Sequence, residues 1–170
     1  MRSRIQRIIL ICIILVACVG CDQATKVLAK KSLAYHPPIS YYHDTFRLQY
    51  AENSGAFLSI GSSLSPTHRF GVFTVATGLA LGAMAAYLLF AEAVGLILVT
   101  GLSLVIAGGT GNLIDRIMNN GAVIDFMNVG IGSLRTGIFN VADVAIMAGT
   151  ILLLVSCSGL GEKHALRKIR

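Results

Sequence analysis

Charged side chains are scarce in this sequence. Only 13% of its 170 residues are charged, whereas 55% are hydrophobic, and the mean hydropathy is +0.74. A soluble globular domain carries about 25% charged residues. The composition therefore excludes an ordinary water-soluble domain and indicates a chain that uses lipid as its apolar solvent.

Other absences narrow the possible chemistry. The sequence has no H-E-x-x-H motif, no serine in a nucleophile-elbow context and no cysteine pattern with metal-ligand spacing. Cys12, Cys18, Cys21 and Cys157 fall within apolar runs, where we expect them to be small buried hydrophobic residues rather than a disulfide framework. No linker, low-complexity tract or repeat divides the chain, so we expect a single domain over residues 1–170.

The net charge of +6 would suggest nucleic acid as a partner if the protein were soluble. The basic residues instead flank the apolar runs, an arrangement that anchors the cytoplasmic ends of membrane helices. We therefore expect no nucleic-acid partner and two cytoplasmic termini. The flanking residues are Arg2, Arg4 and Arg7 before the first run and Lys163, Arg167, Lys168 and Arg170 after the last.

Four apolar segments are candidate membrane spans, because about 20 apolar residues cross a bilayer. They cover roughly residues 8–26, 70–90, 94–116 and 139–160. The first segment, with L15-V-A-C18, also resembles a lipoprotein signal peptide, but three further spans follow it. The expected fold is an all-α polytopic membrane protein with four transmembrane helices.

Short strands are expected in the two regions outside the membrane. Phe46, Leu48 and Tyr50 alternate with polar residues, which is the period of a half-buried strand. Val123–Val129 and Leu134–Phe139 flank a glycine-containing turn and could form a hairpin. These segments predict a small sheet at the outer leaflet. Within the second span, Gly78 and Gly82 could allow close helix packing.

Three aspartates gather at one membrane face in this arrangement. Asp115 closes one apolar run, Asp143 opens the next, and Asp125 lies between Ile124 and Phe126 in the connecting segment. A carboxylate in a membrane helix costs on the order of 2.5–3.5 kcal/mol on insertion scales. Several carboxylates at one face therefore suggest chemistry before they suggest structure.

Two spacings have both a structural and a functional interpretation. Asp22 and Lys26 stand four residues apart, so they could form an interfacial helix pair or shape the mouth of a site. Asn140 and Asp143 could form a capping box at the start of the last helix. That interpretation does not account for Asp125.

Two further motifs also leave alternatives open. Asn53 and Gly55 could form a simple turn, or they could hold an extended peptide. Asn112, Asp115 and Arg116 share one helical face. Arg116 could pair with Asp115, or it could bind a lipid phosphate through its planar fork of donors.

Five motifs together resemble the signature blocks of the bacterial lipoprotein signal peptidase family, signal peptidase II. They occur in the family's order and spread from Asp22 to Asp143. The motifs are D22-Q-A-T-K26, N53-S-G-A-F57, G108-G-T-G-N-L-I-D-R116, V123-I-D-F126 and F139-N-V-A-D143.

The resemblance implies a four-span aspartic endopeptidase of the bacterial inner membrane with a small extracytoplasmic β-cradle. It would cleave prolipoproteins just before the diacylglyceryl-modified cysteine, with Asp125 and Asp143 as the catalytic pair at the extracytoplasmic face. It implies no metal and no cofactor, contacts with membrane phospholipids, and a monomer. The residues it assigns to substrate binding or positioning are Asp22, Lys26, Asn53, Gly55, Asn112, Asp115, Arg116 and Asn140.

The alternative from a different class is a small helical membrane transporter or channel subunit. Such a protein also places acidic residues within a helical bundle, but typically near mid-span and with an internal repeat. Here the acidic residues cluster at one face, and the sequence has no repeat.

Overall fold

The structure is a computed structural model that describes residues 4–55, 65, 68, 70–92 and 94–158. Some residues of the sequence predictions lie outside this part of the chain. They are Arg2, the Ala56 and Phe57 positions of the second motif, the last residues of the fourth expected span, and the basic residues Lys163, Arg167, Lys168 and Arg170.

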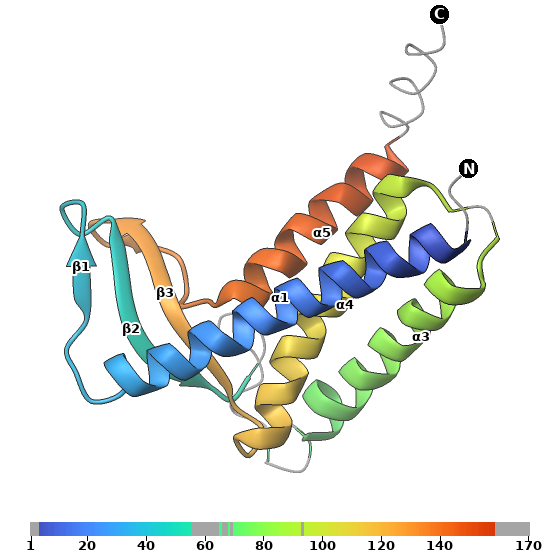
Figure 1. Cartoon of the computed structure of the whole chain (residues 1–170). Helices are drawn as coiled ribbons and strands as arrows, with labels where there is room; N and C mark the ends of the chain where they lie inside the picture. The colour runs from blue at the N-terminus through green and yellow to red at the C-terminus, as the bar shows by residue number, and fades with distance from the viewer. Residues whose placement is uncertain (1–3, 56–64, 66–67, 69, 93, 159–170) are drawn as a thin grey trace, which may run out of the picture.

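The described chain forms a helical bundle with a small antiparallel sheet at one end (Figure 1). The elements in chain order are α1 (Arg4–Leu33), β1 (Ile39–Tyr41), β2 (Phe46–Asn53), the π-helix η2 (Phe70–Ala76), α3 (Thr77–Phe90), α4 (Leu96–Met118), β3 (Val123–Ile131), β4 (Leu134–Arg135) and α5 (Val141–Cys157).

Three of the described helical segments are long and apolar enough to cross a membrane: Arg4–Leu33, Gly71–Phe90 and Leu96–Met118. The apolar helix α5 has only 17 described residues, so the fourth crossing stays a prediction. Large apolar side chains such as Ile13 and Leu79 are exposed on the bundle surface, as expected for helices that face lipid.

The cysteines do not occupy the expected buried positions. Cys12, Cys21 and Cys157 are exposed and Cys18 is half-buried. The prediction of burial within the protein was wrong because an apolar side chain in a membrane helix can face lipid as readily as it faces another helix.

Helix α4 lies at the centre of the bundle: 56% of its most apolar stretch is buried, against 6% for that of α1 and 17% for that of Gly71–Phe90. Glycines allow this packing. A Cβ added at Gly109 would lie 2.6 Å from a Leu81 methyl on α3, and one at Gly111 would lie 2.5 Å from Asp22 Oδ2 on α1. The predicted close contact at Gly82 was wrong, because nothing lies within 4 Å of a Cβ there.

Helix α1 continues seven residues beyond the predicted end of the first span, from Lys26 to Leu33. Ala29 and Leu33 lie on one face of this extension and pack against Phe126 of β3. The sheet therefore supplies an apolar partner after the lipid-facing run has ended. This contact fixes the sheet against the same end of α1 that carries Asp22 and Lys26 (Figure 1).

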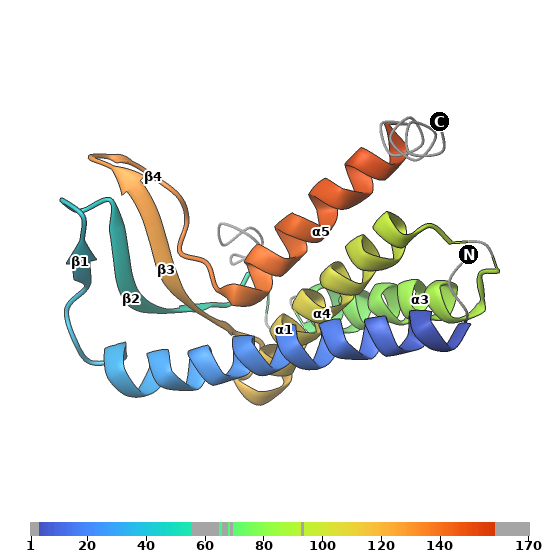
Figure 2. The ribbon, with the colours of Figure 1, turned by 45° about the horizontal axis from the view of Figure 1, so that its top comes forward.

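The sheet has the order β1-β2-β3-β4, with every neighbouring pair antiparallel. Figure 2 shows it as a curved layer that lies over the C-terminal part of α1 and away from α3 and α4. The β2–β3 register shifts between Leu48 and Ala51, so that Leu48 faces Met127 and Ala51 faces Asp125. The extra residue in β2 is a bulge, a feature that redirects side chains near active sites.

The predicted strands and hairpin are present, with different lengths. β3 continues to Ile131, and the turn at Gly132 has a positive φ of 57°, which glycine adopts without strain. β4 contains only Leu134 and Arg135, after which Phe139 forms a single bridge to Met127. Phe139 immediately precedes Asn140, the residue before α5, so this bridge places the start of α5 beside β3.

Candidate active site

The first turn of α5 combines a helix cap with one of the predicted acidic residues. Asn140 is the N-cap: its Oδ1 accepts from the Asp143 N–H at 2.9 Å, and its own N–H donates to Asp143 Oδ2 at 3.1 Å. The predicted capping box is therefore confirmed. Both pairings are local, since they follow from a three-residue spacing at a helix start.

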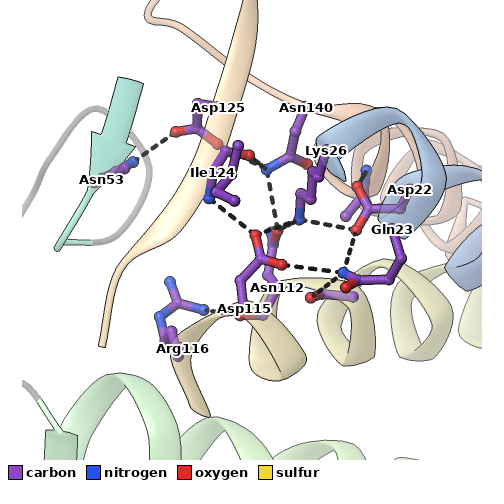
Figure 3. Close-up of polar contacts among 12 residues, drawn as sticks. Asp22, Gln23, Lys26, Asn53, Asn112, Asp115, Arg116, Ile124, Asp125 and Asn140 are labelled. Carbon is purple, nitrogen blue, oxygen red and sulfur yellow. Dashed lines mark hydrogen bonds and ion pairs between the residues drawn. The ribbon is translucent and has the colours of Figure 1, made fainter. Parts of the chain in front are cut away.

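The same Asn140 side chain also reaches the second predicted acidic residue. Its Nδ2 donates to Asp125 Oδ1 at 2.7 Å, and Asn140 is fully buried. One asparagine thus contacts both Asp125, as Figure 3 shows, and Asp143. The cap therefore does not compete with a functional role, because it is the feature that brings the two carboxyl groups together.

Asp125 lies in a buried stretch of β3, 2% exposed, with Ile124 and Phe126 on either side of it. Its Oδ2 accepts a hydrogen bond from Asn53 Nδ2 at 3.1 Å. Burial raises the pKa of Asp125 to about 6; the Asn53 hydrogen bond opposes this shift and the negative charge of Asp143 adds to it. The group is thus poised to hold a proton close to neutral pH.

Helix α4 supplies the contact to the other carboxyl group. Asn112 Nδ2 donates to Asp143 Oδ1 at 2.9 Å, while Asn112 Oδ1 accepts from Lys26 Nζ at 2.9 Å and from Asn140 Nδ2 at 3.1 Å. Both oxygens of Asp143 therefore accept hydrogen bonds at the N-terminus of a helix. That position stabilises a negative charge.

Helix α1 contributes a buried ion-pair cluster behind these residues. Lys26 Nζ lies 2.8 Å from Asp22 Oδ2 and 2.9 Å from Asp115 Oδ2, and all three side chains are at most 3% exposed. The predicted Asp22–Lys26 pair is confirmed, but it is buried and does not line an open mouth. Asp22 Oδ1 also accepts from the Ala142 N–H at 2.9 Å, which joins α1 to the first turn of α5.

Arg116 does not form the pair with Asp115 that the sequence left open, because Asp115 pairs with Lys26. Arg116 Nη2 instead donates to the Gly55 carbonyl at 3.3 Å. The Gly55 N–H donates to Asn53 Oδ1 at 3.0 Å, so the turn orients the Asn53 amide toward Asp125. Arg116 Nε is buried without a hydrogen-bond partner among the described residues.

Sequence reasoning missed two contributors to this site. Gln23 Nε2 donates to Asp22 Oδ2 at 3.2 Å and to Asp115 Oδ1 at 3.1 Å, and the Ile124 N–H donates to Asp115 Oδ2 at 2.9 Å. Gln23 lies three residues before Lys26, and that helical spacing was an available signal. The Ile124 contact is made by the backbone, so no residue type could have predicted it.

All ten predicted site residues thus lie in one connected network drawn from α1, β2 and its following turn, α4, β3 and α5. Figure 3 labels all of them except Gly55 and Asp143. Within the described part of the chain, no group of three or more His, Cys, Asp or Glu residues could hold a metal ion. The expected absence of a metal or cofactor stays a prediction.

Fold and site together define a class of protein. It has a bundle of apolar helices with a small sheet at one end, and there one asparagine contacts two aspartate carboxyl groups. The family model described as signal peptidase (SPase) II matches residues 14–158. The chain belongs to the signal peptidase II family. This membership does not favour the transporter or channel alternative.

Individual relatives agree with this assignment. The chain is 36% identical over 134 residues to the lipoprotein signal peptidase of Syntrophus aciditrophicus, covering 79% of this chain and 83% of that protein. It is also 36% identical over 144 residues to the lipoprotein signal peptidase of Sphingopyxis alaskensis, covering 84% and 81%. A solved structure described as a bacterial membrane enzyme matches with a TM-score of 0.77 and 27% identity over 90% of both chains.

Proposed function

We propose that this protein is a membrane-embedded aspartic endopeptidase that removes signal peptides from prolipoproteins, cutting immediately before the diacylglyceryl-modified cysteine. Membership of the signal peptidase II family and the names of the relatives support the substrate class. Asp125 and Asp143 are the proposed catalytic pair. The observation that carries this assignment is that one residue, Asn140, donates to both carboxyl groups: its side-chain Nδ2 donates to Asp125 and its backbone N–H donates to Asp143.

The two carboxyl groups divide the acid–base work. Neighbouring carboxylates share a proton because both cannot ionise easily. Asp125, whose pKa burial raises, is the proposed proton donor. Asp143, whose oxygens already accept from Asn112 and from the Asn140 backbone, is the proposed proton acceptor.

The reaction then runs through a tetrahedral intermediate without a covalent enzyme adduct. Asp143 takes a proton from water as the water oxygen attacks the scissile carbonyl carbon, and Asp125 protonates the carbonyl oxygen. When the carbon–nitrogen bond breaks, the leaving amine takes the proton from Asp143. Asp125 regains its proton from the intermediate's hydroxyl, and the pair returns to its starting state.

The remaining site residues have proposed supporting roles. The Asn53 side-chain amide donates to Asp125, and the Gly55 N–H orients that amide. Arg116 has a spare buried donor near both aspartates and is the proposed contact for a substrate or lipid phosphate. Membrane phospholipids around the exposed apolar helices are the proposed surroundings of a monomer.

The site is proposed to face the extracytoplasmic side, with both chain termini in the cytoplasm. Contacts between helices, away from the site, support the placement of both termini on one side. Arg7 near the start of α1 donates to the Ala91 carbonyl at the end of α3, at 2.6 Å. Gly149 at the middle of α5 packs against Gly101 near the start of α4.

The test of this function is whether cleavage depends on the substrate's lipid. Burying acyl chains contributes about 0.8 kcal/mol per CH₂, and the exposed apolar helix surfaces offer a place for them. One prolipoprotein, with and without its diacylglyceryl group, should be compared in the same detergent, with Asp143→Asn as the blank. We expect efficient cleavage of the lipidated form alone. Equal rates for both forms would contradict a lipoprotein signal peptidase.

A further inference from the structure

Lys26 is a buried lysine whose ammonium group is fully occupied. Its three donors are matched by three acceptors: Asp22 Oδ2 at 2.8 Å, Asp115 Oδ2 at 2.9 Å and Asn112 Oδ1 at 2.9 Å. The side chain is 2% exposed. It contacts neither Asp125 nor Asp143, so it is not itself a group that exchanges protons with a substrate.

The contact with Asn112 determines which way the Asn112 amide points. Asn112 Oδ1 receives two donors, from Lys26 and from Asn140. Rotating the amide by half a turn would place its amino group against those two donors, an arrangement that forms no hydrogen bond. The Asn112 amino group is therefore held toward Asp143 Oδ1, at 2.9 Å.

We infer that Lys26 is a positioning residue that acts through Asn112: its ammonium group orients the Asn112 amide so that Asp143 is held as the proton-accepting member of the pair. This inference rests on the proposed function, in which Asp143 activates the water. A positioning role differs from a role in which Lys26 merely neutralises the charges of Asp22 and Asp115. A neutralising role needs the ion pairs, whereas the positioning role needs the third contact, to Asn112.

A positioning role for Lys26 predicts the direction in which the pH dependence of cleavage changes when the contact to Asn112 is lost. If the Asn112 donor is lost, the negative charge on Asp143 is less stabilised. The acid limb of the kcat profile, where activity falls as pH decreases, therefore moves upward. The charged groups that surround Asp143 in this argument are Asp125 from β3, Arg116 and Asp115 from α4, and Asp22 and Lys26 from α1.

A charge-balanced double variant isolates the third contact. Lys26→Met combined with Asp22→Asn removes one positive and one negative charge, so the local net charge is unchanged while the donor to Asn112 is lost. Asp22→Asn alone is the matched control, because it leaves the Lys26 contacts to Asp115 and Asn112 in place. Each purified full-length variant should be assayed on a lipidated prolipoprotein across pH, with thermal unfolding in the same detergent measuring the folded fraction.

We expect the double variant to lower kcat by about 10- to 100-fold, to change KM less, and to move the acid limb upward by about one pH unit. The control should not move the acid limb upward. A folded double variant with the wild-type pH profile, or one that is inactive at every pH, would overturn the inference. If the double variant does not fold, Asn112→Ala takes its place, and an unshifted acid limb in that variant would overturn it equally.

These outcomes are separate from a failure of the proposed function. If Asp143→Asn cleaves the same substrate efficiently, the catalytic assignment is wrong whatever Lys26 does. If Asp143→Asn is inactive but the double variant keeps the wild-type profile, only the role of Lys26 is wrong.

Discussion

The structure contains two pairs of aspartates that differ in their partners. Asp22 and Asp115 both contact the ammonium group of Lys26 at 2.8–2.9 Å. Asp125 and Asp143 form no ion pair within the described part of the chain, and their hydrogen bonds come from amide groups. All four belong to one hydrogen-bonded network, of which Figure 3 shows Asp22, Asp115 and Asp125.

The difference teaches which carboxyl groups are available for chemistry. A carboxyl group that contacts a buried ammonium group is engaged in an ion pair, and breaking that pair leaves a charge buried without its partner. Two carboxyl groups that only accept from amides can exchange a proton with each other and with a substrate. We therefore interpret the Lys26 cluster as the structural support and the Asp125–Asp143 pair as the reactive group.

Removing either member of the reactive pair should have the largest effect. Asp125→Asn and Asp143→Asn should each reduce cleavage by about 10²–10⁴-fold, the contribution of general acid–base catalysis, because an amide cannot take or share the proton. Initial rates on a lipidated prolipoprotein, normalised to folded protein, measure this. If Asp143 mattered only as a cap, Asp143→Asn would lose stability and keep its rate per folded molecule.

Weakening the ion-paired cluster should affect stability more than rate. Asp115→Asn removes one partner of Lys26 and weakens the acceptor of the Ile124 N–H, so we expect a loss of about 1–3 kcal/mol in the free energy of unfolding. The rate per folded molecule should fall by less than about 10-fold, because Asp22 still pairs with Lys26. A loss of rate as large as that of Asp125→Asn would erase the distinction between the pairs.

A packing substitution should test the cluster without changing any charge. Gly111→Ala places a methyl group 2.5 Å from Asp22 Oδ2, which should destabilise the protein by about 1–3 kcal/mol through overpacking. Gly82→Ala is the matched control, since nothing lies within 4 Å of the added group. Thermal unfolding in detergent compares the two, and equal stability would mean that α1 and α4 are less closely packed than described.

Local spacing predicted much of this site. The Asp22–Lys26 pair and the Asn140–Asp143 capping box each lie within one helical turn, so sequence alone indicated both. Apolar runs located the helices, but the end of α1 was missed. The run stops near Lys26, whereas the helix continues because Leu33 packs on the sheet.

The contacts that join distant parts of the chain could not be predicted from spacing. Asp22 meets the Ala142 N–H across 120 residues, and Asn53 meets Asp125 across 72. Such contacts depend on how the helices and strands pack. The close approach predicted at Gly78 and Gly82 was wrong at Gly82, where an added Cβ meets nothing within 4 Å, whereas one at Gly111 would lie 2.5 Å from Asp22 Oδ2.

The pH dependence of kcat/KM for the wild-type protein tests the shared proton most directly, since it reports the acid and the base of the free enzyme. Burial raises the pKa of Asp125 to about 6, so its protonated form persists to higher pH than that of an ordinary aspartate. The account predicts a bell-shaped profile, with activity lost at low pH as the pair takes up a second proton and lost at high pH as Asp125 gives its proton up. A rate that rises with pH to a plateau, with no basic limb, would contradict it.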